Sequence, residues 1–250
     1  METVPTNSFS VQQSSIDDES PTFWEHIAVT RRWGRYVSEI ERHAIEYAQG
    51  LVSAPTRALE VGCEGGRWSR MLADKGWQVV CTDVNRDSLR KCQARIPEAR
   101  CVLVQPTDTT LPCDTGAVGL LLCIEVFPVI EGAWFPAEAS RVLSDNGVLV
   151  GVFINKRSLR GAFVHSRAAL QRQEAEENEH RLYTRSYGEW KQRLPQYSFE
   201  VVYEQGFCWF PFPRKSDSPL IPLCTRIEST LGLQKMTSVS PWIVFVARKI

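Results

Sequence analysis

The alternation of short apolar runs with amphipathic segments after Pro55 most limits what this chain can fold into. The strand-like runs span 57–62, 78–83, 100–104, 117–124 and 147–154, and helix-like segments span 66–75, 86–95 and 136–143. The runs are nearly continuous in Val, Leu, Ile and Cys, which is typical of strands covered by helices on both faces. Such alternation builds right-handed crossovers between parallel strands, so we predict an α/β fold with a mostly parallel sheet.

Two further strand-like runs, 199–205 and 242–248, close the chain and are separated by a long aromatic connection with a short helix near 227–231. A late strand pair joined in this way places an antiparallel edge on a parallel sheet. Before the sheet, apolar residues recur at steps of three and four and end near Gly50, which predicts one amphipathic helix. Those positions are Trp33, Val37, Ile40, Ala44 and Tyr47.

The chain length of 250 residues and the texture of the sequence indicate one domain after a disordered tail. The tail covers 1–20, which is polar and poor in large apolar side chains. Within the domain, 21–54 forms an N-terminal helical lid and 55–155 the core of alternating strands and helices. Residues 156–190 form an insertion, and 191–250 hold the C-terminal strand pair with its aromatic loop.

The charge balance and the cysteines exclude several classes of protein. Lys plus Arg and Asp plus Glu each number 29, so no global positive field attracts nucleic acid. No run is long enough to span a membrane and the N-terminus lacks the order of a signal peptide, which predicts a cytoplasmic protein. Eight cysteines include no C-x-x-C pair and several lie in apolar runs, so we expect buried free thiols and no metal site.

The segment from Ala58 to Gly76 carries the chemistry. A strand ends in Glu60, turns through glycines 62, 65 and 66, and enters a helix, where backbone N–H groups and close approach favour a ligand. A second carboxylate, Asp83, ends the next strand and can accept both hydroxyls of a ribose. The turn lacks the G-K-[ST] of a triphosphate site, so a nucleoside with little or no phosphate is the expected guest.

Several motifs in order, from Arg57 to Asn155, resemble the class I S-adenosylmethionine-dependent methyltransferases, especially their small-molecule, type 11-like branch. E-V-G-C-E-G-G at 60–66 resembles the first motif, Asp83 the ribose acid, and LLLCIEVFPVI at 120–130 the fourth motif. The segment ending in GVLVGVFIN and the final SPWIVFVARK resemble the later strands. The resemblance implies a Rossmann-like three-layer sandwich with a seven-stranded sheet whose last strand is antiparallel.

The same resemblance implies the cofactor-binding positions. Glu60 and the backbone of the turn face the methionine end, Asp83 the ribose, Thr107 or Asp108 the adenine amine, and the backbone of the fourth motif the amino group. The remaining positions in this set are Gly62, Cys63, Gly65, Gly66, Val84, Cys123 and Ile124. Two departures stand in the turn: Glu64 replaces a glycine of the family, and Arg67 replaces a small residue.

The N-terminal helix and the substrate side supply further candidates. Arg32 and Arg35 either clamp the cofactor carboxylate or lie on the surface, and Tyr36 either covers the cofactor or packs on the sheet. His165 and Glu125 are the candidates for a general base, although methyl transfer needs one only when the nucleophile holds its proton tightly.

These features predict transfer of a methyl group from S-adenosylmethionine to an O, N or C nucleophile of a small, partly apolar molecule, releasing S-adenosylhomocysteine. Three alternatives stay open: a binding or regulatory protein that kept the fold and lost catalysis, an RNA or protein methyltransferase, and an NAD-dependent dehydrogenase. The sequence leaves the oligomeric state open.

Overall fold

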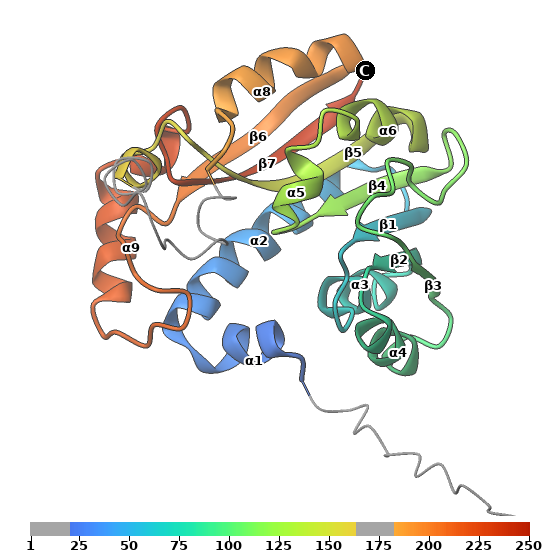
Figure 1. Cartoon of the computed structure of the whole chain (residues 1–250), viewed down its shortest axis with the longest axis horizontal. Helices are drawn as coiled ribbons and strands as arrows, with labels where there is room; N and C mark the ends of the chain where they lie inside the picture. Colours follow the sequence, from blue (N-terminus) through green and yellow to red (C-terminus); the bar gives the residue numbers. More distant parts are fainter. Residues whose placement is uncertain (1–20, 164–182) are drawn as a thin grey trace, which may run out of the picture.

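A seven-stranded sheet in the order β3-β2-β1-β4-β5-β7-β6 forms the centre of the protein in a computed structural model, which describes residues 21–163 and 183–250 (Figure 1). The strands are β1 (Arg57–Val61), β2 (Gln78–Asp83), β3 (Arg100–Leu103), β4 (Val118–Cys123), β5 (Leu143–Ile154), β6 (Phe199–Phe207) and β7 (Trp242–Lys249). The first five pair in parallel, whereas β7 runs antiparallel to β5 and to β6. The predicted fold class is therefore confirmed.

Helices cover both faces of the sheet and give the three layers. They are α1 (Phe23–Thr30), α2 (Arg32–Leu51), α3 (Arg67–Ala73), α4 (Arg86–Arg95), α5 (Phe127–Ile130), α6 (Phe135–Val142), α8 (Tyr187–Arg193) and α9 (Ile221–Thr230). One apolar core joins the sheet to α2, α3 and α4, and the other joins it to α6 and α8. In Figure 1, α6 and α8 lie at the top and α3 and α4 at the bottom.

The alternation of side chains along β4 shows why both faces are apolar. Leu120 and Leu122 enter the core beneath α2 and α3, while Leu121 and Cys123 enter the core beneath α6. All six residues of β4 are buried, as the continuous apolar run predicted.

The amphipathic helix that was predicted to end near Gly50 is α2, and a separate short helix, α1, precedes it. Arg31 has an extended backbone and separates α1 from α2. The two helices then cross closely at Gly34, where an added Cβ would lie 2.2 Å from the carbonyl oxygen of Ile27. Only glycine permits this approach, and the close crossing positions α1 beside the carboxyl ends of the strands.

Other differences from the prediction are small. The short helix α5 was not predicted, α9 begins six residues before the expected 227, and β5 begins at Leu143. The predicted tail and most of the 156–190 insertion lie outside the described residues. No helix within 21–163 or 183–250 has both the length and the apolar character for crossing a bilayer.

Candidate active site

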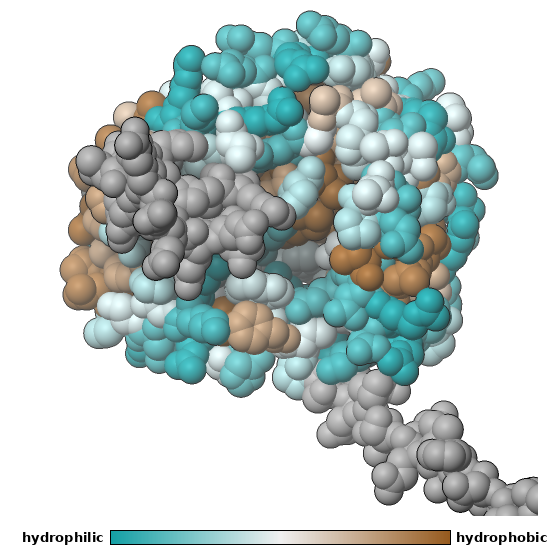
Figure 2. Space-filling model, viewed as in Figure 1, coloured by the Kyte–Doolittle hydropathy of each residue, from teal (hydrophilic) through white to brown (hydrophobic). Residues whose placement is uncertain are grey.

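The site lies where the sheet order reverses, at the carboxyl ends of the neighbouring strands β1 and β4. Their following helices leave toward opposite faces, and open α/β sheets bind ligands at such a point. In the view of Figure 2 the molecule is hollowed near its centre, at the end of β4, with apolar residues inside the hollow.

Two adjoining cavities occupy this edge. We name the first, of about 370 Å³, the charged cavity; it is lined by Trp24, Glu60, Gly62, Cys63, Glu64, Arg67, Trp68, Asp83, Asn85, Ser88, Ile124, Glu125, Val126 and Arg214. We name the second, of about 290 Å³, the apolar cavity; its walls include Val61, Val84, Val104, Asp108, Leu111, Pro112, Pro128, Val129 and Trp134. Gly62, Asp83 and Val126 line both, so the two cavities form one continuous cleft.

The glycine turn brings the backbone close to the opposite wall of the cleft. Gly62 has a φ of +69°, and an added Cβ would lie 2.5 Å from a methyl carbon of Val126. Gly66, with a φ of +82°, precedes α3 as its N-cap. The turn therefore presents backbone N–H groups at a helix N-terminus, where a side chain would otherwise fill the space.

Glu60 is buried at the end of β1 and lines the charged cavity. Its carboxylate accepts a hydrogen bond from the Ser69 hydroxyl of α3. Burial raises the pKa of Glu60 to about 8, and the neighbouring Cys81 adds to the rise. A cationic group placed beside this carboxyl would favour its ionised form.

Asp83 stands at the junction of the two cavities. Its Oδ2 accepts a hydrogen bond from the backbone N–H of Glu64 at 2.9 Å, and its Oδ1 accepts one from that of Asn85 at 2.8 Å. These bonds fix the carboxylate between the glycine turn and the start of α4. Each oxygen keeps a lone pair for a ligand hydroxyl.

The apolar cavity contains Asp108 and Val84, two of the predicted cofactor positions, among aliphatic and proline side chains. Asp108 accepts a hydrogen bond from the backbone N–H of Gln105 at 2.7 Å. Thr107 is not among the lining residues, so the structure favours Asp108 for the acid position. A flat apolar slot with one carboxylate at its edge suits a heteroaromatic ring that carries an amine.

Of the other predicted positions in the turn and the fourth motif, some line the charged cavity and the others are buried beside it. Cys63 and Ile124 line the charged cavity. Gly65, Gly66 and Cys123 are buried and are not lining residues of either cavity. The two glycines thus serve the shape of the turn, and Cys123 packs in the core beneath α6.

The three predicted positions on α2 lie away from the cleft. Arg32 pairs with Asp217 at 3.4 Å, and Arg35 donates to the carbonyl of Val29. The Tyr36 hydroxyl donates to Glu228 at 2.5 Å and accepts from the N–H of Cys208. For Arg32 and Arg35 the surface alternative holds, and for Tyr36 the packing alternative holds.

We expect Arg32→Ala to leave the dissociation constant for S-adenosylmethionine unchanged within about twofold, because the side chain faces Asp217 outside the cleft. Both partners are nearly half exposed, so the lost pair lowers the free energy of unfolding by less than about 1 kcal/mol. Titration calorimetry and urea unfolding measure the two quantities. A tenfold weaker affinity would restore Arg32 as the carboxylate clamp.

The charged cavity holds Glu125, the predicted base, directly after β4. Its φ of +56° is unusual for a residue with a side chain and indicates that the surrounding packing imposes this conformation. The guanidinium of Arg214 lies 3.9 Å from the Glu125 carboxylate and stacks on Trp24 and Trp242. His165, the other predicted base, lies outside the described residues.

Glu41 on α2 is a further acid of this site that sequence reasoning missed. Its side chain is fully buried and pairs with Arg67 at 3.3 Å, while its other oxygen has no hydrogen-bond partner among residues 21–163 and 183–250. Burial, followed by the charge of Glu125, raises the pKa of Glu41 well above that of an ordinary carboxyl. The sequence feature that could have identified Glu41 is its position on the apolar stripe of α2, four residues after Val37 and four before Ile45.

The aromatic segment 207–212 of the C-terminal loop does not line the cleft. Phe207 is buried in the core, and none of Trp209, Phe210 and Phe212 is a lining residue of either cavity. That segment instead leads to Arg214, which reaches the charged cavity. Trp24 from α1 supplies an aromatic side of that cavity.

Comparison with known proteins agrees with this geometry. The sequence model of the methyltransferase-domain family matches residues 59–151, which run from β1 into β5 and contain the glycine turn and Asp83. Residues 59–151 therefore match a methyltransferase domain, and a solved methyltransferase structure shares the fold. Domains of this class use S-adenosylmethionine as the methyl donor, as the motifs implied. A search of the curated proteins finds no match.

Solved structures share the fold of this methyltransferase domain at low sequence identity. Geranyl diphosphate C-methyltransferase from Streptomyces coelicolor is 14% identical, with a TM-score of 0.58 over 87% of this chain and 82% of that chain. A SAM-dependent methyltransferase from Methanosarcina mazei is 14% identical, with a TM-score of 0.56 over 81% and 96%. The [4+2]-cyclase SpnF is 15% identical, with a TM-score of 0.58 over 87% and 82%.

Proposed function

We propose that this methyltransferase domain binds S-adenosylmethionine along the cleft and transfers its methyl group to a small acceptor in the charged cavity. The observation that carries the proposal is the position of Asp83, whose fixed carboxylate stands where the two cavities meet. A nucleoside with a polar end, a ribose and a flat apolar base would need a charged cavity, a carboxylate and an apolar cavity in this order.

The residues of the cleft fit that cofactor. Glu60 offers a carboxylate for the amino end, Asp83 two acceptor oxygens for the ribose, and the apolar cavity with Asp108 a slot for adenine. The turn of Gly62 leaves room where a Cβ would meet Val126.

Glu64, which replaces a family glycine, is compatible with this arrangement. Its backbone N–H binds Asp83, and its own carboxylate accepts a bond from the N–H of Trp24 at 3.4 Å. Burial raises the pKa of Glu64. The residue thus ties α1 to the turn.

The acceptor side of the charged cavity combines aromatic faces with paired charges. Trp24 and Arg214 lie against one another, and Glu125 faces Arg214 across the cavity. These groups suit a small molecule with an apolar body and a polar nucleophile that can donate a proton to Glu125. The bound cofactor supplies a methyl group already activated as a sulfonium, so the protein's task is to orient the acceptor and accept its proton.

Two alternatives differ from this proposal in what they predict. A degenerate fold would bind the cofactor weakly and transfer nothing, and a [4+2]-cyclase is a protein of the same fold with another activity. An RNA or protein methyltransferase would transfer the methyl group to a macromolecule. The test is incubation with methyl-labelled S-adenosylmethionine and a fractionated extract of small molecules, RNA and proteins. Label in a small-molecule product supports the proposal, whereas label confined to RNA or protein, or no transfer, contradicts it.

The raised pKa of Glu60 gives a pH-dependent prediction. Between its ordinary value of 4.5 and about 8, the native state holds a proton that the unfolded state has lost. The free energy of unfolding therefore falls as pH rises through this window, by up to about 1.4 kcal/mol per pH unit from this group. Glu60→Gln keeps an acceptor for Ser69 and removes the titration.

Urea unfolding of both proteins at several pH values between 5 and 8 measures this effect. We expect the difference in unfolding free energy, variant minus wild type, to grow with pH in favour of Glu60→Gln. The comparison subtracts the contributions of Glu41 and other shared groups. A difference that stays constant over this range would contradict a protonated Glu60.

A further inference from the structure

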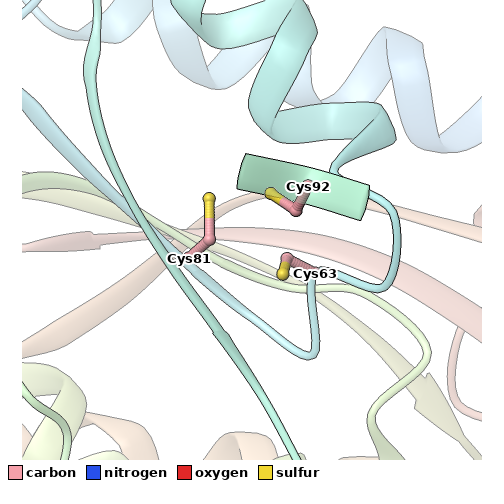
Figure 3. Close-up of side chains that lie close together, drawn as sticks. All are labelled: Cys63, Cys81 and Cys92. Atoms are coloured by element: carbon pink, nitrogen blue, oxygen red, sulfur yellow. The ribbon is translucent and has the colours of Figure 1, made fainter. Parts of the chain in front are cut away.

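Three cysteines far apart in the sequence meet behind the glycine turn. Cys63 lies in the turn after β1, Cys81 in β2 and Cys92 in α4, and their sulfur atoms all lie within 4.8 Å of one another (Figure 3). All three side chains are at most 3% exposed. No C-x-x-C pattern marks this cluster in the sequence, because each thiol comes from a different element.

The spacing of the sulfur atoms is close to that of a metal-thiolate site. A zinc–sulfur bond of about 2.3 Å sets sulfur atoms about 3.8 Å apart in a tetrahedral arrangement. The three sulfur atoms therefore need to approach one another by about 1 Å at most. No imidazole belongs to this set, and three thiolates select soft closed-shell ions such as Zn²⁺ and Cu⁺.

The Cys81 thiol also donates a hydrogen bond to the hydroxyl oxygen of Ser69 in α3 at 3.0 Å. An ion bound by the three sulfur atoms would displace the thiol protons, because metal ligands must be deprotonated.

We propose that Cys63, Cys81 and Cys92 form a site for one thiophilic metal ion of the Zn²⁺ or Cu⁺ class. As each sulfur–metal bond forms, any proton on that sulfur passes to solvent, and no electron is transferred. Cys63 also lines the charged cavity, which gives the ion a path from the cleft.

The site is coupled to the glycine turn by direct contact. An added Cβ at Gly66 would lie 2.7 Å from the sulfur of Cys92, so the backbone of the turn packs directly against this thiol. A bound ion would join the turn to β2 and α4 at the three points that carry its ligands. We therefore expect metal binding to raise the melting temperature of the full chain.

The test is metal titration of the full chain, reduced and stripped of metal, under anaerobic conditions. Zn²⁺ is measured in competition with a chromophoric chelator, Cu⁺ with a Cu⁺-specific chelator, and Co²⁺ reports thiolate ligation by its charge-transfer absorption. We expect one equivalent to bind, and Cys63→Ser, Cys81→Ser or Cys92→Ser each to weaken binding about a hundredfold or more. Preference between Zn²⁺ and Cu⁺ in these two arms distinguishes the ions.

Cys113→Ser is the matched control, because this half-buried thiol packs against the opposite core and should leave binding unchanged. Cys92→Ala provides a second, apolar replacement in case serine unfolds the chain, with circular dichroism as the check. Absence of stoichiometric binding, binding that survives loss of the three thiols, or a disulfide among them in the reduced preparation would overturn the proposal. The titration uses no methyl donor, so its failure leaves the proposed methyl transfer untouched.

Discussion

Replacing Asp83 by alanine is expected to weaken S-adenosylmethionine binding about a hundredfold. The carboxylate offers two acceptor oxygens to the ribose, and each hydrogen bond to a charged group contributes about 1.5–3 kcal/mol. Alanine also releases the backbone N–H groups of Glu64 and Asn85, which Asp83 now holds. The loss therefore affects the ligand contact and the shape of the turn together.

Titration calorimetry with S-adenosylmethionine and S-adenosylhomocysteine measures this loss. Asp83→Asn keeps one carbonyl oxygen and is expected to give an intermediate affinity. Asp87→Ala is the matched control, because this aspartate lies exposed in the first turn of α4 and outside both cavities. Equal affinity of Asp83→Ala and the wild type would remove Asp83 from the site.

Replacing Glu125 by glutamine is expected to lower kcat about a hundredfold while leaving the cofactor dissociation constant unchanged. Loss of a positioned general base costs about that factor or more. Glutamine retains the length of the side chain and suits the same left-handed backbone, so the cavity keeps its shape. The rate is measured with labelled methyl donor and the acceptor fraction that the wild type methylates.

The split between kcat and KM separates two roles for Glu125. A base lowers kcat, whereas a residue that only holds Arg214 in place raises KM for the acceptor. Glu46→Gln makes the same chemical change on the exposed face of α2, beside Lys75, and should leave both constants unchanged. An unchanged kcat in Glu125→Gln would exclude Glu125 as the general base.

The centre of the sheet was predictable because its strands are buried on both faces. The apolar runs that became β2 and β4 have no polar face to obscure them, so their bounds were predicted to within a residue. The position of the carboxylates Glu60 and Asp83 at one edge of the sheet could then be predicted, because they lie at the ends of two neighbouring parallel strands.

Residues whose position depends on packing between distant segments were harder to predict from the sequence. Arg32 and Arg35 flank a core tryptophan, but the break at Arg31 sets the rotation of α2 and turns both arginines away from the cleft. Glu41 reaches the site from α2, near the start of the chain. Arg214 reaches it from a loop near the end of the chain, and that loop has no periodic pattern of apolar residues. No local pattern joins such residues.

Hydrogen–deuterium exchange of the full chain with and without S-adenosylhomocysteine reports cofactor binding and its location together. We expect slower exchange in the presence of the ligand at residues 62–67, 83–88 and 124–129, which form the glycine turn and the edges of the two cavities. Slower exchange confined to other segments, or identical exchange at saturating ligand, would show that the cofactor does not bind in this cleft.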